Sequence, residues 1–173
     1  MSTIARDTAA STGSAAATGV SGAVTADTGA AVTRAAIGLA VLRVVLGIVF
    51  AAHGAQKLFQ MGIPGLTEGF AAMGVPLAGV AAPAVALLEF VGGLALIAGL
   101  FVAPIALGLT VVMVGALFLV HLPAGFFLPN GYEFVLTLGA GAVALALAGP
   151  GAWSLDGLLA RRRAAKQAEG RRL

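Results

Sequence analysis

Two ionisable side chains, Arg43 and Glu89, lie deep inside apolar stretches of this sequence. If these stretches cross a bilayer, a lone charge costs about 2.5 to 3.5 kcal/mol on insertion scales, so each residue needs a partner and invites a functional role. A long arginine side chain can close several ångströms toward a carboxylate on an antiparallel neighbour. The sequence therefore predicts a buried polar core in which Glu89 pairs with Arg43, with His53 as a second candidate partner for Glu89.

Further polar side chains are expected at the outer end of the same helices. His53 lies one turn from Lys57, while His121 ends the third apolar stretch and Glu133 begins the fourth. We expect an outward-opening pocket formed by His53, Gln56, Lys57, His121 and Glu133. Histidine and carboxylate exchange protons near neutral pH, so the pocket could take a quinone head group, relay protons or hold a small polar substrate. Alternatively, these groups are interfacial caps and polar pairs that hold the helices together.

The residue types limit the cofactors. The sequence has no cysteine, which excludes disulfides, cysteine-ligated zinc or iron–sulfur clusters and a dithiol redox site. A haem would need two facing axial ligands, for which His53 and His121 are the only candidates, and we do not expect one. Two histidines with Glu133 could form a facial metal site, but nothing in the spacing requires a metal and none is predicted. The sequence identifies no cofactor, and quinone is compatible with it.

The elements that position these residues are predicted to be membrane-spanning helices. The chain is 60% hydrophobic and 10% charged with a mean hydropathy of +1.03, which leaves too little polar surface to coat a soluble globule. We predict an all-α fold, an integral membrane up-down four-helix bundle, because short connections make successive helices antiparallel neighbours. The spans are expected at about 35–59, 79–101, 105–122 and 132–148, with a short interfacial piece at Leu66–Met73.

The two ends of the chain differ in composition. Residues 1–33 are rich in Ser, Thr, Ala and Gly and are expected to form a disordered tail before a membrane domain at 34–157. Residues 158–173 form a basic tail, and six of the ten Lys and Arg residues lie between Arg161 and Arg172. This clustering is a topology signal that predicts both termini in the cytoplasm, and it does not resemble a nucleic-acid-binding face. The expected partner is the lipid bilayer, with no nucleic acid.

The polar residues form motifs that resemble a known family. The motifs read Arg43-x3-Gly47-x2-Phe50-x2-His53-Gly54-x-Gln56-Lys57-Leu58-Phe59, then Gly74-x-Pro76, Glu89-Phe90-x-Gly92-Gly93 and Gly99-Leu100, and finally Gly131-Tyr132-Glu133 and Gly149-Pro150-Gly151-x2-Ser154-Leu155-Asp156. Over about residues 35–157 the sequence resembles the DoxX family. The resemblance implies a small four-helix bacterial membrane protein, similar to a subunit of thiosulfate:quinone oxidoreductase and to a mycobacterial component of a membrane oxidoreductase complex linked with thiol and superoxide stress. The family's motif positions fall on Arg43, His53, Lys57, Glu89 and Glu133.

Three functions are compatible with these observations. The first is an accessory or quinone-facing component of an oxidoreductase complex in the bacterial cell (plasma) membrane, which would be a non-autonomous subunit because no cofactor motif is present. The second is a small transporter or permease-like protein whose polar groups line a path. The third is a scaffold or assembly factor without catalysis. Bound quinone would favour the first, proton or solute flux the second, and co-purified partners without either the third.

Overall fold

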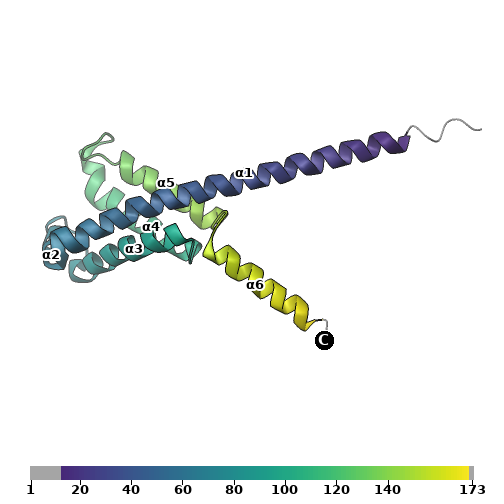
Figure 1. Ribbon diagram of the computed structural model, residues 1–173. Coiled ribbons are helices and arrows are strands. Elements are labelled where there is room, and N and C mark those ends of the chain that lie inside the picture. Colours follow the sequence, from purple (N-terminus) through teal and green to yellow (C-terminus); the bar gives the residue numbers. More distant parts are fainter. Residues whose placement is uncertain (1–12, 172–173) are drawn as a thin grey trace, which may run out of the picture. The chain divides into compact units, whose positions relative to one another are not determined.

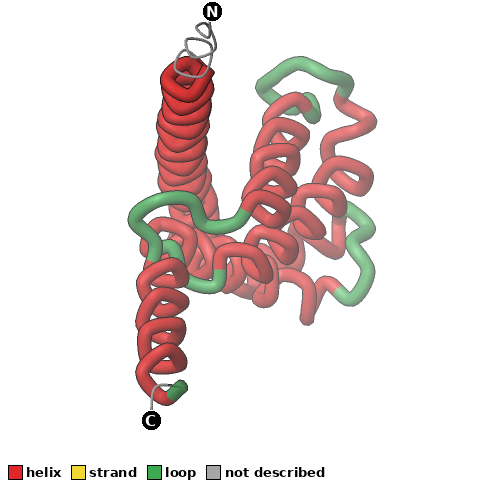
Figure 2. The backbone as a smooth tube through the Cα atoms, turned by 90° about the vertical axis from the view of Figure 1, so that its right-hand side faces the viewer, coloured by secondary structure: helices red, strands yellow, loops and turns green. Residues whose placement is uncertain are grey.

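The structure is a computed structural model that describes the backbone of residues 13–171 and the side chains of residues 31–171. It separates into two compact units, residues 1–36 and 37–173, and every site discussed below lies in the second unit. The described residues are helical apart from turns and short loops, and no strand occurs among them (Figures 1 and 2). The prediction of an all-α fold is confirmed.

Three helical segments are long and apolar enough to cross a membrane. The first covers Ala31–Ala72 and includes the end of α1 (Gly13–Ala55), the π-helical segment η1 (Gln56–Met61) and α2 (Gly62–Ala72). The second is α3 (Ala78–Ala98), and the third covers Val102–Ala124, which comprises α4 (Val102–Ala116), the π-helical η2 (Leu117–His121) and the 3₁₀-helical η3 (Leu122–Ala124). A shorter apolar helix, α5 (Glu133–Ala148), is the fourth element of the predicted bundle, and α6 (Leu155–Gly170) follows it.

The N-terminal segment differs from the prediction. The sequence predicted a disordered tail over residues 1–33, whereas α1 begins at Gly13. Residues 1–12 of the predicted tail lie outside the described residues. An alanine-rich segment permits a helix because alanine has the highest intrinsic helix propensity, even where no hydrophobic periodicity announces one.

The turn between the second and third helices lies three residues earlier in the chain than predicted. Gly99 adopts a left-handed backbone with φ of 73° and ends α3 at Ala98, and α4 begins at Val102 rather than near Ile105. Pro104 is therefore inside the first turn of α4 and not in the connector. A proline is tolerated there because the first N–H groups of a helix have no intrahelical acceptor.

Helices α1 and α3 pack at backbone contact. A Cβ atom added to Gly47 would lie 2.8 Å from the Gly93 carbonyl oxygen, and one added to Gly54 would overlap the backbone of Phe90. Small residues allow this close approach, which drives helix association in lipid where hydrophobicity does not. Leu46 and Phe50 of α1 join a core cluster that includes residues of α3, α4 and α5.

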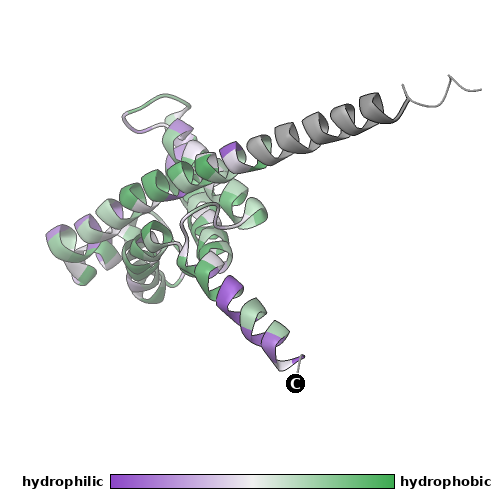
Figure 3. Cartoon of the chain, turned by 45° about the vertical axis from the view of Figure 1, so that its right-hand side comes forward, coloured by the Kyte–Doolittle hydropathy of each residue, from purple (hydrophilic) through white to green (hydrophobic). Residues whose placement is uncertain are grey.

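The surface of the bundle is apolar, as a lipid-facing surface must be. Figure 3 shows hydrophobic residues along α1, α3 and α4, whereas hydrophilic residues gather on α6. The described chain is therefore a helical membrane protein with a basic C-terminal helix. Which end of the bundle faces the cytoplasm stays a prediction.

The contact between Gly54 and Phe90 can be tested by adding a single methyl group. We expect Gly54→Ala to lower the free energy of unfolding by about 1 to 3 kcal/mol, because the new Cβ must force the two backbones apart. The measurement is thermal unfolding of the purified protein in detergent. The matched control is Gly115→Ala in α4, where no heavy atom lies within 4 Å of the added Cβ. An unchanged stability of Gly54→Ala would contradict the close packing.

Candidate functional site

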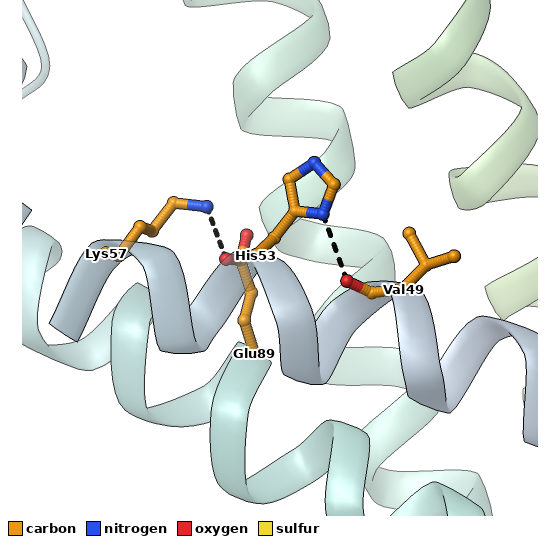
Figure 4. Close-up of polar contacts among 4 residues, drawn as sticks. All are labelled: Val49, His53, Lys57 and Glu89. Carbon is orange, nitrogen blue, oxygen red and sulfur yellow. Dashed lines mark hydrogen bonds and ion pairs between the residues drawn. The ribbon is translucent and has the colours of Figure 1, made fainter. Parts of the chain in front are cut away.

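The candidate site is an ion pair between Lys57 and Glu89 inside the membrane-spanning region. The Lys57 Nζ donates to Glu89 Oε2, and the two side chains are 19% and 4% exposed respectively. Figure 4 shows the ammonium of Lys57 and the carboxylate of Glu89 pointing toward each other from the neighbouring helices. Because the pair places opposite charges in contact, each residue reduces the cost of having the other in an apolar medium.

The packing of α1 against α3 explains this pairing. Gly54 touches the backbone of Phe90. Lys57 lies one turn after Gly54 and Glu89 directly precedes Phe90, so the approach of the two backbones brings Lys57 and Glu89 side by side. Lys57 also lies in the π-helical segment η1, where the wider turn changes the direction of the side chains relative to a regular α-helix. Single π-helical turns inside α-helices occur frequently at functional sites.

His53 lies one turn from Lys57 and faces the start of α5. Its Nδ1 lies 3.0 Å from the backbone oxygen of Val49, and its ring centroid is 5.7 Å from that of Phe134 (Figure 4). If Nδ1 carries the proton and donates it to Val49, Nε2 is left as an acceptor. No hydrogen bond joins His53 to Lys57 or Glu89 among the described residues.

Arg43 does not pair with Glu89, and the predicted pair is wrong. The guanidinium is buried, with Arg43 only 2% exposed, but its Nη1 donates to the Pro150 carbonyl at 2.9 Å and its Nη2 to the Trp153 carbonyl at 3.1 Å. Arg43 precedes Lys57 by about 21 Å along the axis of α1, so it lies near the other end of the bundle. Irregular backbone at that end offers carbonyl oxygens that accept from both terminal nitrogens of the guanidinium, whereas its buried Nε–H has no hydrogen-bond partner among the described residues.

Residues 150–156, which we call the exit segment, are fixed at several points besides Arg43. The Asp156 carboxylate accepts hydrogen bonds from the N–H groups of Phe101 and Val102, both at 3.0 Å, and so caps the first turn of α4. The Asp156 N–H in turn donates to the Gly99 carbonyl at 3.0 Å. Gly99 lies directly against Arg43 and Ser154, so a side chain there would have no room. These contacts give Arg43 a structural role at the α3–α4 turn.

The remaining residues of the predicted outward pocket have separate partners. His121 Nδ1 lies 2.9 Å from the Asn130 carbonyl, and Glu133 Oε1 accepts from the Leu128 N–H at 2.8 Å, so both organise the loop before α5. Gln56 is exposed. Between residues 31 and 171 no hydrogen bond or ion pair joins two of the side chains predicted for the pocket, and a single pocket formed by all of them stays a prediction.

Two other types of site receive no support in the described part of the chain. No group of three His, Cys, Asp or Glu side chains there is close enough to hold a metal ion, so His53, His121 and Glu133 do not form the facial arrangement considered above. A groove of about 250 Å³ between α4 and α5 is apolar, and its hydroxyl, Thr110, donates to the Ala106 carbonyl at 2.8 Å. The groove therefore offers no free donor to a polar substrate.

Sequence reasoning missed the partner of each buried charge. The sequence predicts Lys57 in the outward pocket, whereas the structure pairs it with Glu89. The carbonyl groups of Pro150 and Trp153, which bind Arg43, are not predicted from the sequence. The signal for the first pair was present in Gly54, because a glycine on a polar helix face marks where another backbone can approach. No signal in the sequence marks a backbone carbonyl as the partner of an arginine.

Comparison with known proteins gives consistent results. The family model described as DoxX matches residues 38–122. The inner membrane protein YqjF of Escherichia coli is 38% identical over 128 residues, which cover 71% of this chain and 92% of that protein. A protein of Bacillus subtilis named "Putative oxidoreductase CatD" is 32% identical over 120 residues, 69% of this chain and 85% of that protein. An uncharacterised membrane protein of Mycobacterium tuberculosis is 33% identical over 135 residues, 70% of this chain and 80% of that protein. No solved structure matches the chain.

Double-mutant cycles distinguish the observed pairing from the predicted one. We expect the Lys57→Gln and Glu89→Gln changes to be coupled by about 0.5 to 3 kcal/mol in the free energy of unfolding, because the two side chains are in contact. Arg43→Gln and Glu89→Gln should be additive within about 0.5 kcal/mol, because these residues share no partner. Unfolding of the purified protein in mixed micelles measures all of these variants. Strong coupling of Arg43 with Glu89 would contradict the structure.

Proposed function

This chain is a membrane protein of the DoxX family, and from that premise we propose that it is a quinone-facing subunit of a bacterial membrane oxidoreductase. The observation that carries the proposal is the Lys57–Glu89 pair in the membrane-spanning region. The comparisons support the family and the membrane location, and the name of the Bacillus subtilis relative, "Putative oxidoreductase CatD", adds the link with redox chemistry.

Packing of α1 against α3 does not require the Lys57–Glu89 ion pair. Gly47, Gly54 and Gly93 already bring α1 and α3 together at backbone contact. Replacing a buried ion pair with apolar residues of similar size is often neutral or stabilising in proteins, so such a pair is weak evidence for a purely structural role. An ionisable residue inside a membrane is by default a candidate functional group. The Lys57–Glu89 pair is therefore a candidate site for ligand binding or proton transfer.

The chemistry of the pair suits a quinone head group. A quinone presents carbonyl oxygens that need hydrogen-bond donors, and its isoprenoid tail keeps it in the bilayer. The Lys57 ammonium has three N–H donors, of which Glu89 engages one, and its side chain is partly accessible. Glu89 holds a carboxylate within reach of the same position. His53 adds a ring nitrogen one turn away.

The residues would bind the head group and move protons, but they cannot supply electrons. Reduction of a quinone to a quinol consumes two electrons and two protons. Glu89 and His53 are the groups at the site that can accept and release protons. The chain has no cysteine for a dithiol or iron–sulfur site, and we assign the delivery of the electrons to a partner subunit with its own redox cofactor. The chain would therefore act as part of a complex.

The experiment is extraction of small molecules from the purified protein. The full chain is purified gently into nanodiscs, and bound quinone is quantified by mass spectrometry and by its optical spectrum. We expect quinone with the wild type, and a loss of about tenfold or more with Glu89→Gln or Lys57→Gln, because each change removes a charge-assisted hydrogen bond. The control is Glu68→Gln, which removes the same type of charge from an exposed position in α2.

The yields of folded protein must be matched before the variants are compared. An empty wild type that also fails to bind added quinone would overturn the proposal. In that case proton or solute flux in vesicles would favour the transporter alternative, and partners that co-purify without flux would favour the scaffold alternative.

A further inference from the structure

The helix that follows the membrane bundle carries an uncovered stripe with two chemical characters. In α6, five residues recur at the spacing i, i+3, i+4, i+7 and i+11, so they share one helical face. We call this set the α6 stripe, and it consists of Leu155, Leu158, Leu159, Arg162 and Lys166. The leucines are 44%, 46% and 42% exposed, so the bundle does not cover them. The stripe is apolar near the bundle and basic farther along.

A strained and exposed tryptophan precedes the stripe. Trp153 is 78% exposed, and its backbone is left-handed with φ of 49°, a region that bulky residues rarely adopt. Its carbonyl is held by the Nη2 of Arg43. Strain of this kind persists only where surrounding contacts impose it, and it directs attention to a function. Here the contacts hold an indole on the outside of the protein, and tryptophan is enriched where membranes meet water.

The exit segment fixes where the stripe begins. Asp156 forms hydrogen bonds with Gly99, Phe101 and Val102 in the α3–α4 turn. Two membrane spans end at this turn. Ser154 accepts a hydrogen bond from the Gly157 N–H at 3.1 Å and so starts α6 at the same level. Trp153 and Leu155 are therefore at the boundary of the apolar bundle, where the headgroups of the lipids lie. In Figure 1, α6 leaves the bundle from this point.

We propose that α6 docks on the anionic phospholipid headgroups of the membrane that the bundle crosses. Trp153 and the three leucines insert at the interface, and Arg162 and Lys166 bind headgroup phosphates on the same face. Charge complementarity favours this partner, because a basic segment next to a membrane span is attracted to an anionic leaflet. The leucines distinguish it from a nucleic acid or an acidic soluble protein, since neither needs an apolar strip that begins at the membrane. The inference does not depend on the quinone proposal.

Site-directed spin labels test the docking without background, because the chain has no cysteine. The matched positions are Ala165→Cys, which follows Leu158 by two turns, and Ala164→Cys on the opposite face. Both alanines are exposed. The labelled full chain is placed in nanodiscs of phosphatidylcholine alone, or of phosphatidylcholine and phosphatidylglycerol in a two-to-one ratio. Collision with a water-soluble nickel chelate and with oxygen then reports whether each label contacts water or lipid.

In the anionic nanodiscs we expect the label at 165 to be several-fold less accessible to the chelate than the label at 164. Each basic side chain near an anionic surface raises the ratio of docked to free helix about fivefold. Arg162→Gln combined with Lys166→Gln should therefore lower this ratio about twenty-five-fold, and added salt should act in the same direction. Arg161→Gln combined with Arg171→Gln removes the same charge away from the stripe and should preserve most of the difference.

Three results would overturn the proposal. They are equal accessibility of the two labels in anionic nanodiscs, the same difference between the labels in both lipid compositions, and an equal loss in the two double variants. Every substituted position is exposed in α6 or directly after it, so the bundle and its Lys57–Glu89 pair remain intact in all of these proteins.

Discussion

The cost of placing charge in hydrocarbon constrains this molecule more than any other interaction. Two buried residues, Glu89 and Arg43, carry that cost, and the structure satisfies them in different ways. Glu89 is neutralised by Lys57 on the neighbouring helix, whereas Arg43 donates from its two terminal nitrogens to two backbone carbonyls of the exit segment. The first solution places an ion pair between η1 and α3. The second fixes the C-terminal end of the bundle against the α3–α4 turn.

Both solutions depend on glycine. Gly54 allows the backbone of Phe90 to approach α1, and the approach brings Lys57 to Glu89. Gly99 leaves the space that the guanidinium of Arg43 and the backbone of Ser154 fill. The small residues therefore set the positions of the charged ones, and a methyl group at either glycine would disturb an electrostatic contact as well as a helix interface. This link between packing and charge joins the fold to the proposed chemistry.

The sequence predicted the fold better than it predicted the contacts. Hydropathy alone identified the apolar segments that the structure shows as helices, and the motifs identified the family that the comparisons support. It also singled out Arg43 and Glu89, because a charge in an apolar run is visible without a structure. It failed on their partners. Arg43 bonds to Pro150 across 107 positions of the chain, through a carbonyl that every residue possesses, and the contact between Lys57 and Glu89 depends on the register of two helices.

The most direct measurement of the central claim is a reduced-minus-oxidised infrared difference spectrum of the full chain in nanodiscs that contain a membrane quinone. The account predicts a carboxyl band that appears or shifts when the quinone is reduced and that is absent from Glu89→Gln, because Glu89 changes its protonation or its hydrogen bond beside the head group. Spectra of the wild type and of Glu89→Gln that show the same carboxyl region would contradict it. The pair would then hold two helices together and take no part in redox chemistry.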